Sequence, residues 1–416
     1  MSAPRPDLPR QGDNNPVANP VPSAGIYIHI PFCKVKCPYC DFYSLADRDE
    51  AMDRLVNCLV NEIRSVRGSG LDLRFDTLFI GGGTPSLLSP AHLEQILTAL
   101  QTAIGLDNVE EFTLEANPGE APEDKLRDFR SLGVNRLSMG FQSFDTALLQ
   151  FLGRLHGPQA CIDTFEAARR AGFENINADL MFNIPGQSLS RWQADLKTLA
   201  NLEPEHISAY SLTVETGTPL HDWVAAGEVT MPPEDTDVSM FSWVRDYLPR
   251  QGYKAYEVSN YARGDRTCRH NLHYWRIEPY LGLGPSAHGF DGSRRTWNIR
   301  SLDGYMEAVE AGRSSVAGGE QLSERQLHNE RLAFGLRLSE GLSVTEDLGY
   351  SEPRDFVTRF QAQLERYEGQ LVLSGDRLAL TARGLMLADA IAADLMLAAG
   401  PVPELGFERI RVRAGS

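Results

Sequence analysis

The chain has 416 residues, 42% of them hydrophobic, and a formal net charge of −16. This length predicts two or three domains, or one large α/β barrel with an appendage, and the acidic charge argues against a nucleic-acid or anionic-membrane binder, because both partners are polyanions. No apolar run reaches the roughly 18 residues of a membrane-spanning helix and no signal-peptide core is present, so we expect a cytoplasmic protein with free thiols.

Residues 1–24 contain six prolines, separated by Asn, Ser and Asp. This composition predicts a disordered arm, because it cannot form a packed core. A transit peptide is the weaker alternative, since no amphipathic helix is present and Asp7 and Asp13 are acidic. We expect the ordered part to begin at Gly25.

Short apolar runs predict six strands, at residues 26–30, 77–80, 111–115, 136–139, 177–182 and 207–212. Segments with helical periodicity lie between them. Ser89 and Pro90 are typical of a helix start, and Gly172 is typical of a helix end. The alternation predicts a parallel sheet, and six units fit an incomplete (β/α)6 barrel over residues 25–235. In barrels the chemistry lies on loops at the carboxyl ends of the strands.

Two further segments follow the predicted barrel. Residues from about 235 to 305 are rich in aromatic residues and glycine, and we expect residues 236–319 to form an extension of the barrel with the H-N-x-x-Y-W motif. Residues 320–416 combine helical patterns with a hairpin signal at Ser374-Gly375-Asp376, which predicts a small C-terminal helical, winged-helix-like domain. Such domains often bind DNA, but no basic stripe is present, so a structural or lid domain is preferred.

Three cysteines fall within eight residues just after the first predicted strand: Cys33, Cys37 and Cys40. A structural zinc site needs a fourth ligand, and none is close in sequence. Three thiolates on one loop instead suit three corners of a [4Fe–4S] cluster, which leaves the fourth iron open to a small molecule. A zinc knuckle or three incidental cysteines remain the alternatives. Cys58 and Cys161 have apolar neighbours and are expected to be small buried side chains.

The ends of the later strands carry glycines or polar residues that a buried structural strand does not need: Gly81-Gly82-Gly83-Thr84-Pro85, Glu115, Gln142, Arg154 and Asp179. Glycine lets the backbone approach a ligand closely. A carboxylate accepts from hydroxyl or ammonium groups, and Arg154 can pair with the carboxylate of an amino acid. The alternatives are a simple turn for the glycines and solvated loops for Glu115 and Arg154. Asp179 within an apolar strand is costly unless paired, which favours a functional role.

With these motifs in place, the chain resembles the radical S-adenosylmethionine (SAM) superfamily, and within it the oxygen-independent coproporphyrinogen III oxidase family. The resemblance covers about residues 25–400 and includes Tyr27-Ile-His29-Ile-Pro31-Phe32-Cys33, Glu115-Ala-Asn-Pro118 and Gly140-Phe-Gln142-Ser-Phe. It implies that Cys33, Cys37 and Cys40 ligate a [4Fe–4S] cluster whose open iron binds SAM, which can be split to a 5′-deoxyadenosyl radical. The implied SAM contacts are Tyr27, Tyr39, Gly82, Gly83, Thr84, Glu115, Gln142, Arg154 and Asp179. For Tyr27 and Tyr39, aromatic packing beside the loop is an equal alternative.

Two sequence features separate the branches of that family. The oxidases carry a fourth cysteine two residues after the third, where this chain has Phe42. His270-Asn271-Leu-His273-Tyr274-Trp275 resembles an H-N-x-x-Y-W motif that is proposed to bind heme in the HemW-type branch. Imidazole is a good axial ligand of heme iron, so His270 is the preferred candidate, and His273 and Cys268 are rivals. Alternatively, His270 and His273 only hydrogen-bond within the fold.

The resemblance therefore favours a heme chaperone that carries a [4Fe–4S] cluster and SAM. Its expected partners are heme and heme-acceptor proteins such as respiratory-chain enzymes, with no nucleic acid. A homodimer, membrane contact through the acceptors and the use of radical chemistry stay open, so the chain is not assigned as an enzyme. The alternative function is that of an oxygen-independent coproporphyrinogen III dehydrogenase, which decarboxylates two propionates of a porphyrinogen.

Overall fold

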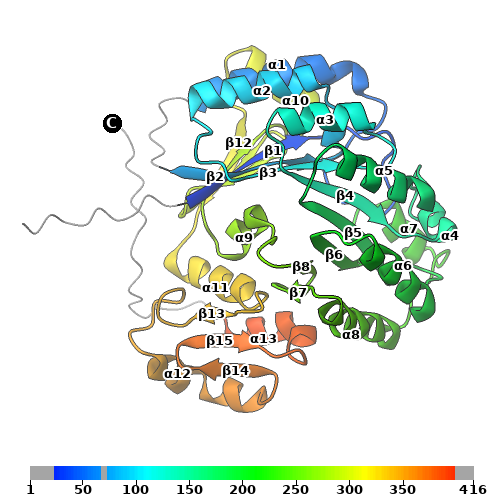
Figure 1. Cartoon of the computed structure of the whole chain (residues 1–416). Helices are drawn as coiled ribbons and strands as arrows, with labels where there is room; N and C mark the ends of the chain where they lie inside the picture. Colours follow the sequence, from blue (N-terminus) through cyan, green and yellow to red (C-terminus); the bar gives the residue numbers. More distant parts are fainter. Residues whose placement is uncertain (1–22, 67–72, 399–416) are drawn as a thin grey trace, which may run out of the picture.

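The computed structural model describes residues 23–66 and 73–398 (Figure 1). Residues 1–22 of the predicted arm lie outside the described residues. Ser23 and Ala24 belong to the first strand, so the ordered part begins two residues earlier than predicted. Within the described part, no helix has the length and apolarity needed to cross a membrane.

Each of the six predicted strands is present, with its ends within three residues of the expected limits. They are β1 (Ser23–Ile30), β2 (Arg74–Gly82), β3 (Glu111–Ala116), β4 (Arg136–Gln142), β5 (Ile176–Phe182) and β6 (His206–Ser211). All five neighbouring pairs are parallel and follow chain order. The carboxyl ends of these strands therefore meet at one edge of the sheet, as the barrel prediction requires.

Helices join these strands and cover the outer, convex face of the curved sheet (Figure 1). They are α1 (Met52–Val66), α2 (Pro90–Ala103), α3 (Glu123–Ser131), α4 (Thr146–Phe151), α5 (Pro158–Arg170) and α6 (Leu189–Asn201). The predicted start of α2 is confirmed, since the Ser89 hydroxyl accepts from the backbone N–H of His92 at 3.1 Å. The predicted stop after α5 is also confirmed, because Gly172 has a φ of +92°.

Alternate residues of the strands point to opposite faces of the sheet. Ile26, Ile28 and Ile30 of β1 are fully buried in the main core beneath the outer helices. Tyr27 and His29 point to the inner face, where Tyr27 stacks against Phe79 of β2. The inner face thus carries polar and aromatic side chains, and the core lies outside it.

The sheet continues beyond the six strands at both ends. The strand order is β12-β11-β10-β9-β1-β2-β3-β4-β5-β6-β8-β7 among the described residues. The added strands are β7 (Lys254–Ala255), β8 (Asn260–Ala262), β9 (Tyr280–Leu283), β10 (His288–Phe290), β11 (Arg294–Asn298) and β12 (Val316–Gln321). The less regular segment after residue 235 therefore extends the barrel sheet, with β9 parallel to β1.

The helices of this extension are α7 (Pro219–Ala225), α8 (Glu234–Arg250), α9 (Arg269–Trp275) and α10 (Leu302–Glu310). The short helix α9 lies on the inner, concave side of the sheet (Figure 1), where it contacts β1 and β2. α9 carries the H-N-x-x-Y-W motif, so the fold brings this motif inside the partial barrel.

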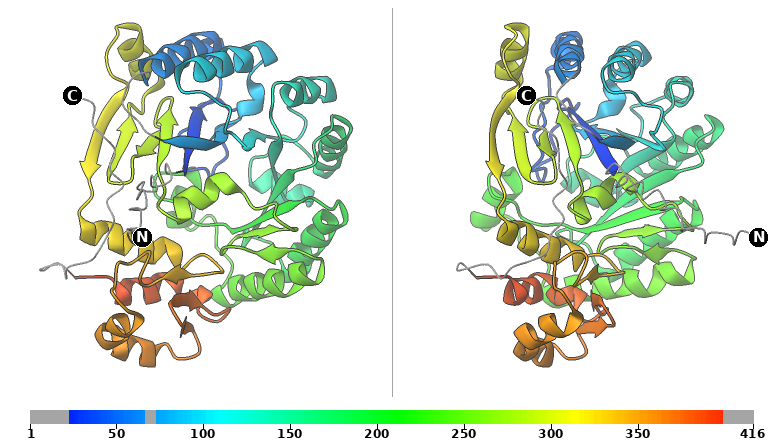
Figure 2. Two further views of the ribbon diagram at one scale, coloured as in Figure 1. Left: turned by 60° about the vertical axis from the view of Figure 1, so that its left-hand side comes forward. Right: turned by 90° about the vertical axis from the view of Figure 1, so that its left-hand side faces the viewer.

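The C-terminal part has its own hydrophobic core, which runs from Leu332 to Leu397. It contains α11 (Glu324–Gly335), α12 (Pro353–Arg366), α13 (Ala388–Leu395), β13 (Leu342–Ser343), β14 (Leu371–Ser374) and β15 (Arg377–Leu380). β14 and β15 form the predicted hairpin. In the views of Figure 2 this part lies beside the open side of the partial barrel, next to α8. The domain limits at 235 and 319 stay a prediction.

Candidate functional site

The carboxyl ends of the barrel strands surround a cavity of about 570 Å³. We call it the cysteine cavity, because all three clustered cysteines line it. Eight of the nine predicted SAM contacts also line it: Tyr39, Gly82, Gly83, Thr84, Glu115, Gln142, Arg154 and Asp179. The remaining residue, Tyr27, lies elsewhere on the inner face. Parallel pairing of the strands therefore brings together side chains that are far apart in sequence, at the carboxyl ends of the strands as expected for a barrel.

The three clustered cysteines lie on one loop, from Cys33 to Cys40, which we call the cysteine loop. Backbone hydrogen bonds hold this loop where it leaves the sheet. The backbone N–H of Cys33 donates to the carbonyl of Leu45 at 2.9 Å, and the N–H of Leu45 donates to the carbonyl of Pro31 at 2.7 Å. Within the loop, the Cys40 N–H donates to the Cys37 carbonyl at 3.1 Å. These bonds hold the loop at the end of β1 and place its sulfur atoms at the edge of the sheet.

Neighbouring elements hold the outer side of the same loop. A Cβ at Gly153, just after α4, would lie 2.8 Å from the Pro38 ring, so the chain approaches the loop closely there. The N–H of Leu220 in α7 donates to the Pro38 carbonyl at 2.9 Å. Tyr39 packs on an apolar cluster that includes Leu148 and Leu152, and it also lines the cysteine cavity. Its ring therefore has the packing role that the sequence analysis gave as the alternative to SAM binding.

The glycines after β2 are required by close contacts. A Cβ at Gly83 would lie 2.5 Å from the carbonyl oxygen of Phe32, and one at Gly82 would lie 2.5 Å from the His29 ring. Gly82 also has a φ of +113°, which side chains rarely adopt. The N–H groups of Gly83 and Thr84 donate to the carbonyls of Ile30 and Phe32, so this segment continues the sheet beside the cysteine loop. The glycine run is therefore more than a turn, because only glycine fits beside the loop.

Two carboxylates face the cysteine cavity from neighbouring strands. Glu115 accepts from the N–H of Gly82 at 3.0 Å, and Asp179 accepts from the Nδ2 of Asn177 at 2.7 Å. Burial raises the pKa of Glu115 to about 7, and the Asp179 carboxylate adds to this rise. Burial also raises the pKa of Asp179. A cationic or hydroxyl-bearing ligand would stabilise both groups, as the amino and ribose parts of SAM can do.

Arg154 connects the strand ends to the cysteine loop. Its Nη2 donates to Asn117 Oδ1 at 2.5 Å and to the Gly140 carbonyl at 2.7 Å. Its Nη1 lies 3.6 Å from the sulfur of Cys37. The surface alternative considered for this arginine is wrong, because the side chain lines the cavity and has partners on two strands. Gln142 has a φ of +68°, an uncommon backbone conformation for a non-glycine residue and one that clusters at functional sites.

Sequence reasoning missed several residues of the cavity. They are Asn117, Ser138, Met181, Tyr210, Ser211 and Thr213, among others. Tyr210, Ser211 and Thr213 come from the carboxyl end of β6, where the barrel rule placed chemistry although we named no residue there. Thr84 donates to the Cys33 sulfur at 3.6 Å and accepts from Asn117 Nδ2 at 2.9 Å, so Thr84 connects Asn117 to the cysteine loop.

The site fits an iron–sulfur cluster by its donor set. Three cysteine sulfurs line one cavity, and burial raises the pKa of the Cys33 and Cys40 thiols, so iron binding would displace their protons. Among the described residues, no three His, Cys, Asp or Glu side chains are grouped closely enough for a single metal ion. Cluster irons each bind one thiolate, so the three sulfurs need not converge on one point.

The predicted heme ligand His270 is held inside the fold. Its side chain is 1% exposed. Its Nδ1 is hydrogen-bonded to Thr77 Oγ1 at 2.8 Å and its Nε2 to the Tyr274 hydroxyl at 2.8 Å. Burial lowers its pKa to about 3. With both nitrogens occupied, His270 has the arrangement of a structural histidine, the alternative that the sequence left open.

The two rivals are also engaged. His273 Nε2 lies 2.8 Å from Asp76 Oδ1, and its Nδ1 lies 2.6 Å from Glu278 Oε2. Burial lowers its pKa, but these carboxylates raise it further, to about 9. Cys268 is fully buried, and burial raises its pKa to about 12. His270 and His273 attach α9 to β2, and Cys268 attaches the start of α9 to Glu111 of β3.

The chain is similar to known proteins in both sequence and fold. Residues 27–199 match the radical SAM superfamily. The heme chaperone HemW of Bacillus subtilis is 37% identical over 308 residues, 73% of this chain and 81% of that protein. The heme chaperone HemW of Mycobacterium tuberculosis is 35% identical over 382 residues, 89% and 94% of the two chains. The solved coproporphyrinogen III oxidase of Escherichia coli has the same fold, with a TM-score of 0.76, 21% identity and 90% of each chain covered.

Proposed function

The chain belongs to the HemW family of the radical SAM superfamily, and we propose that it is a heme chaperone that binds heme and delivers it to acceptor hemoproteins. We propose further that Cys33, Cys37 and Cys40 bind a [4Fe–4S] cluster. SAM would occupy the rest of the cysteine cavity. Relatives named heme chaperones, which align over most of their length, support the proposal.

The observation that carries the proposal is the position of Phe42. This ring stands where the oxidases of the resembling family have a fourth cysteine, and it is 71% exposed. It lines the cysteine cavity and also a second, aromatic cavity on the inner face. An exposed phenyl ring on the rim of a cofactor site suits contact with a flat apolar ligand.

The chain's own groups have separable roles in this proposal. Arg154 would hold the carboxylate of SAM, and Glu115 and Asp179 would hold its amino and hydroxyl groups. The cluster supplies a low-potential electron when bound. The glycines at 82 and 83 let the backbone lie against His29 and the base of the cysteine loop, where a Cβ would collide, and so would present backbone groups to the ligand in the cavity.

The acceptors would be respiratory-chain enzymes or other hemoproteins in the cytoplasm or at its membrane. Contact with a membrane would then pass through the acceptor, since the chain is acidic and would be repelled by anionic lipid.

One anaerobic incubation tests this function against the alternative. The reconstituted chain is mixed with SAM, a low-potential reductant and coproporphyrinogen III, and chromatography follows 5′-deoxyadenosine and protoporphyrinogen. The proposal expects no catalytic formation of protoporphyrinogen. Multiple turnovers to protoporphyrinogen would instead assign the chain as a coproporphyrinogen III dehydrogenase, in spite of Phe42.

A further inference from the structure

The geometry points to His288 as the axial ligand of heme iron, in an aromatic cavity of the inner face that His270 does not line. This inference rests on the proposed heme function and names the site within it. The cavity has a volume of about 390 Å³ and lies between β1, α9, the cysteine loop and the turn from β9 to β10. We call it the tyrosine cavity.

Aromatic side chains dominate this cavity. Tyr27, Tyr43, Tyr274 and Tyr280 line it, together with Phe42 at its rim. Tyr274 and Tyr280 meet edge to face, with their ring centroids 4.7 Å apart. Burial raises the pKa of Tyr27, so this phenol stays protonated and neutral at ordinary pH. A surface of neutral rings favours a planar apolar ligand.

His288 is the imidazole of this cavity that is free to bind iron. His29 also lines the cavity, but its Nδ1 is 3.0 Å from the Tyr27 hydroxyl and its Nε2 is 2.8 Å from the Tyr43 carbonyl. His288 is exposed and lies beside the Trp297 ring, and no described residue hydrogen-bonds to its ring nitrogens. An accessible imidazole nitrogen of this kind can bind heme iron as an axial ligand.

The charges of the tyrosine cavity suit the carboxylates of a heme. Arg300 lines the cavity, and its guanidinium lies 5.7 Å from the centre of the Tyr43 ring, with no carboxylate of a described residue in ion-pair contact. Asp41 is the one carboxylate among the lining residues, and it is solvent-exposed beside the cysteine loop. A propionate is therefore favoured at Arg300 and disfavoured at Asp41.

The tyrosine cavity also adjoins the cysteine cavity. Asp41 and Phe42 line both, so the two cavities meet at one short segment that follows Cys40 directly. A ligand too large for the tyrosine cavity can extend over Phe42. This contact places heme within reach of the cluster loop without occupying the SAM contacts of β2 to β5.

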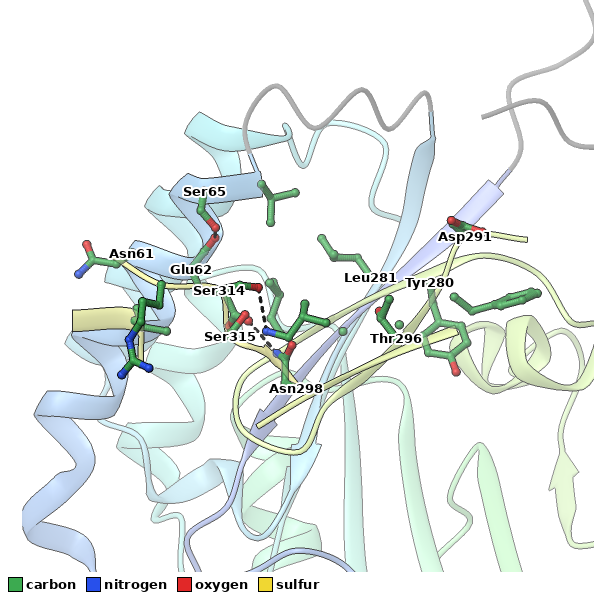
Figure 3. A pocket seen from close by; sticks show the side chains of 18 of the residues that line it. Asn61, Glu62, Ser65, Tyr280, Leu281, Asp291, Thr296, Asn298, Ser314 and Ser315 are labelled. Carbon is green, nitrogen blue, oxygen red and sulfur yellow. Dashed lines mark hydrogen bonds between the residues drawn. The ribbon is translucent and has the colours of Figure 1, made fainter. Parts of the chain in front are cut away.

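A larger cavity of about 760 Å³ offers no comparable ligand. It lies on the outer side of the sheet between α1, α10 and β9 to β12 (Figure 3). Its lining residues include no His, Cys or Met. Its buried carboxylate, Glu62, already accepts from Gly284 N–H at 2.8 Å and from Asn298 Nδ2 at 2.7 Å. Its volume alone therefore does not make it a heme site.

The test is a hemin titration of the full, cluster-reconstituted chain, read by the Soret band and, after reduction of the bound heme with dithionite, by the iron–imidazole stretch in resonance Raman spectra. His288→Ala should abolish the iron–imidazole stretch and raise the Kd for hemin by about tenfold or more, which corresponds to about 1.4 kcal/mol. His288→Gly with added imidazole should restore the stretch. The matched control is His221→Ala, a partly exposed histidine outside the tyrosine and cysteine cavities, which should change neither quantity.

Arg300 is tested with hemin and hemin dimethyl ester. Arg300→Ala should weaken binding of hemin several-fold and leave binding of the ester unchanged, whereas Arg354→Ala on the distant α12 should affect neither. If the iron–imidazole stretch survives in His288→Ala, or is lost in a folded His270→Gln variant, the assignment of His288 is wrong while heme binding stands. If the unmodified chain binds no hemin, the proposed function itself fails, and this inference fails with it.

Discussion

The guanidinium of Arg154 lies 3.6 Å from the sulfur of Cys37, while its other terminal nitrogen donates to Asn117 and to the Gly140 carbonyl. One side chain thus joins the cysteine loop, the residue that follows β3 and the strand β4. A ligand carboxylate that binds Arg154 is therefore brought next to the loop that would carry the cluster. The contact between Arg154 and Cys37 therefore links the predicted SAM contacts to the predicted cluster ligands. The sequence predicted both groups but not the contact between them.

The variant Arg154→Lys distinguishes the contribution of the positive charge of Arg154 to SAM binding from that of its planar guanidinium group. Lysine keeps the positive charge but lacks the planar fork that holds two partners at once. We expect SAM affinity to fall by about tenfold, or about 1.4 kcal/mol, with the iron content of the reconstituted protein kept. Equilibrium dialysis with labelled SAM measures this. An unchanged affinity would place the SAM carboxylate elsewhere.

The cysteine assignment predicts a sharp division among the six cysteines. Cys33→Ala, Cys37→Ala and Cys40→Ala should each lose the broad visible absorption of a [4Fe–4S] cluster after reconstitution. Cys58→Ala and Cys161→Ala are matched controls, because both residues are buried in the main core and neither lines the cysteine cavity. They should retain full iron and sulfide content. A complete cluster in Cys33→Ala would remove that residue from the ligand set.

Much of this site could be predicted, because the barrel rule needs only the ends of apolar runs. Glu115 ends a predicted strand, Gln142 follows one and Asp179 lies within one, and parallel pairing brings them close together in the sheet. Tyr27 could not be placed in the same way. It is on the inner face of β1 and stacks on Phe79 and His270, so it lines the tyrosine cavity instead.

Glu115 gives a pH-dependent prediction in protein that lacks SAM. The usual pKa of a glutamate is near 4.5, and burial with the Asp179 charge raises that of Glu115 to about 7. The folded chain therefore holds this proton when the unfolded chain has lost it, so stability falls as pH rises from about 4.5 to 7. Glu115→Gln should remove up to roughly 3 kcal/mol of this loss.

Melting temperatures at pH 5 and pH 8 measure the effect. The Gln variant should lose less stability between these pH values than the parent chain. Glu94→Gln, at an exposed position of α2, is the control and should melt as the parent does at both. Equal pH dependence in the parent and in Glu115→Gln would show that Glu115 is ionised in the folded chain throughout this range.

His273 predicts a loss of stability at alkaline pH. Its pKa rises from 6.5 to about 9, because the Asp76 and Glu278 carboxylates outweigh the lowering by burial. The ion pairs of protonated His273 stabilise the folded chain fully below pH 6.5. This stabilisation is lost as pH rises through about 9, for a total of roughly 3 kcal/mol at most. His273→Gln should melt lower at pH 7 but show a smaller further fall by pH 9.5. A steeper fall than in the parent would contradict the ion pairs.

The heme ligand was the least predictable part of the site. The motif His270-Asn271-Leu-His273-Tyr274-Trp275 forms α9, but the sequence does not tell which of its imidazole nitrogens are free. His270 and His273 satisfy buried partners from β2, which lies nearly 200 positions earlier in the chain. Only the folded chain reveals that long-range pairing, and His288 carries no sequence signal beyond a glycine-rich turn.

The most direct test of the chaperone account is heme transfer to an acceptor. The chain, loaded with one equivalent of hemin and carrying its cluster, is mixed with the heme-free form of a respiratory-chain hemoprotein, and the Soret band of the acceptor is followed. The account predicts that the acceptor gains heme faster than it does from hemin on albumin, and that excess apo-myoglobin does not abolish the gain. Transfer at the rate of free hemin release, fully blocked by apo-myoglobin, would contradict delivery as the function of this protein.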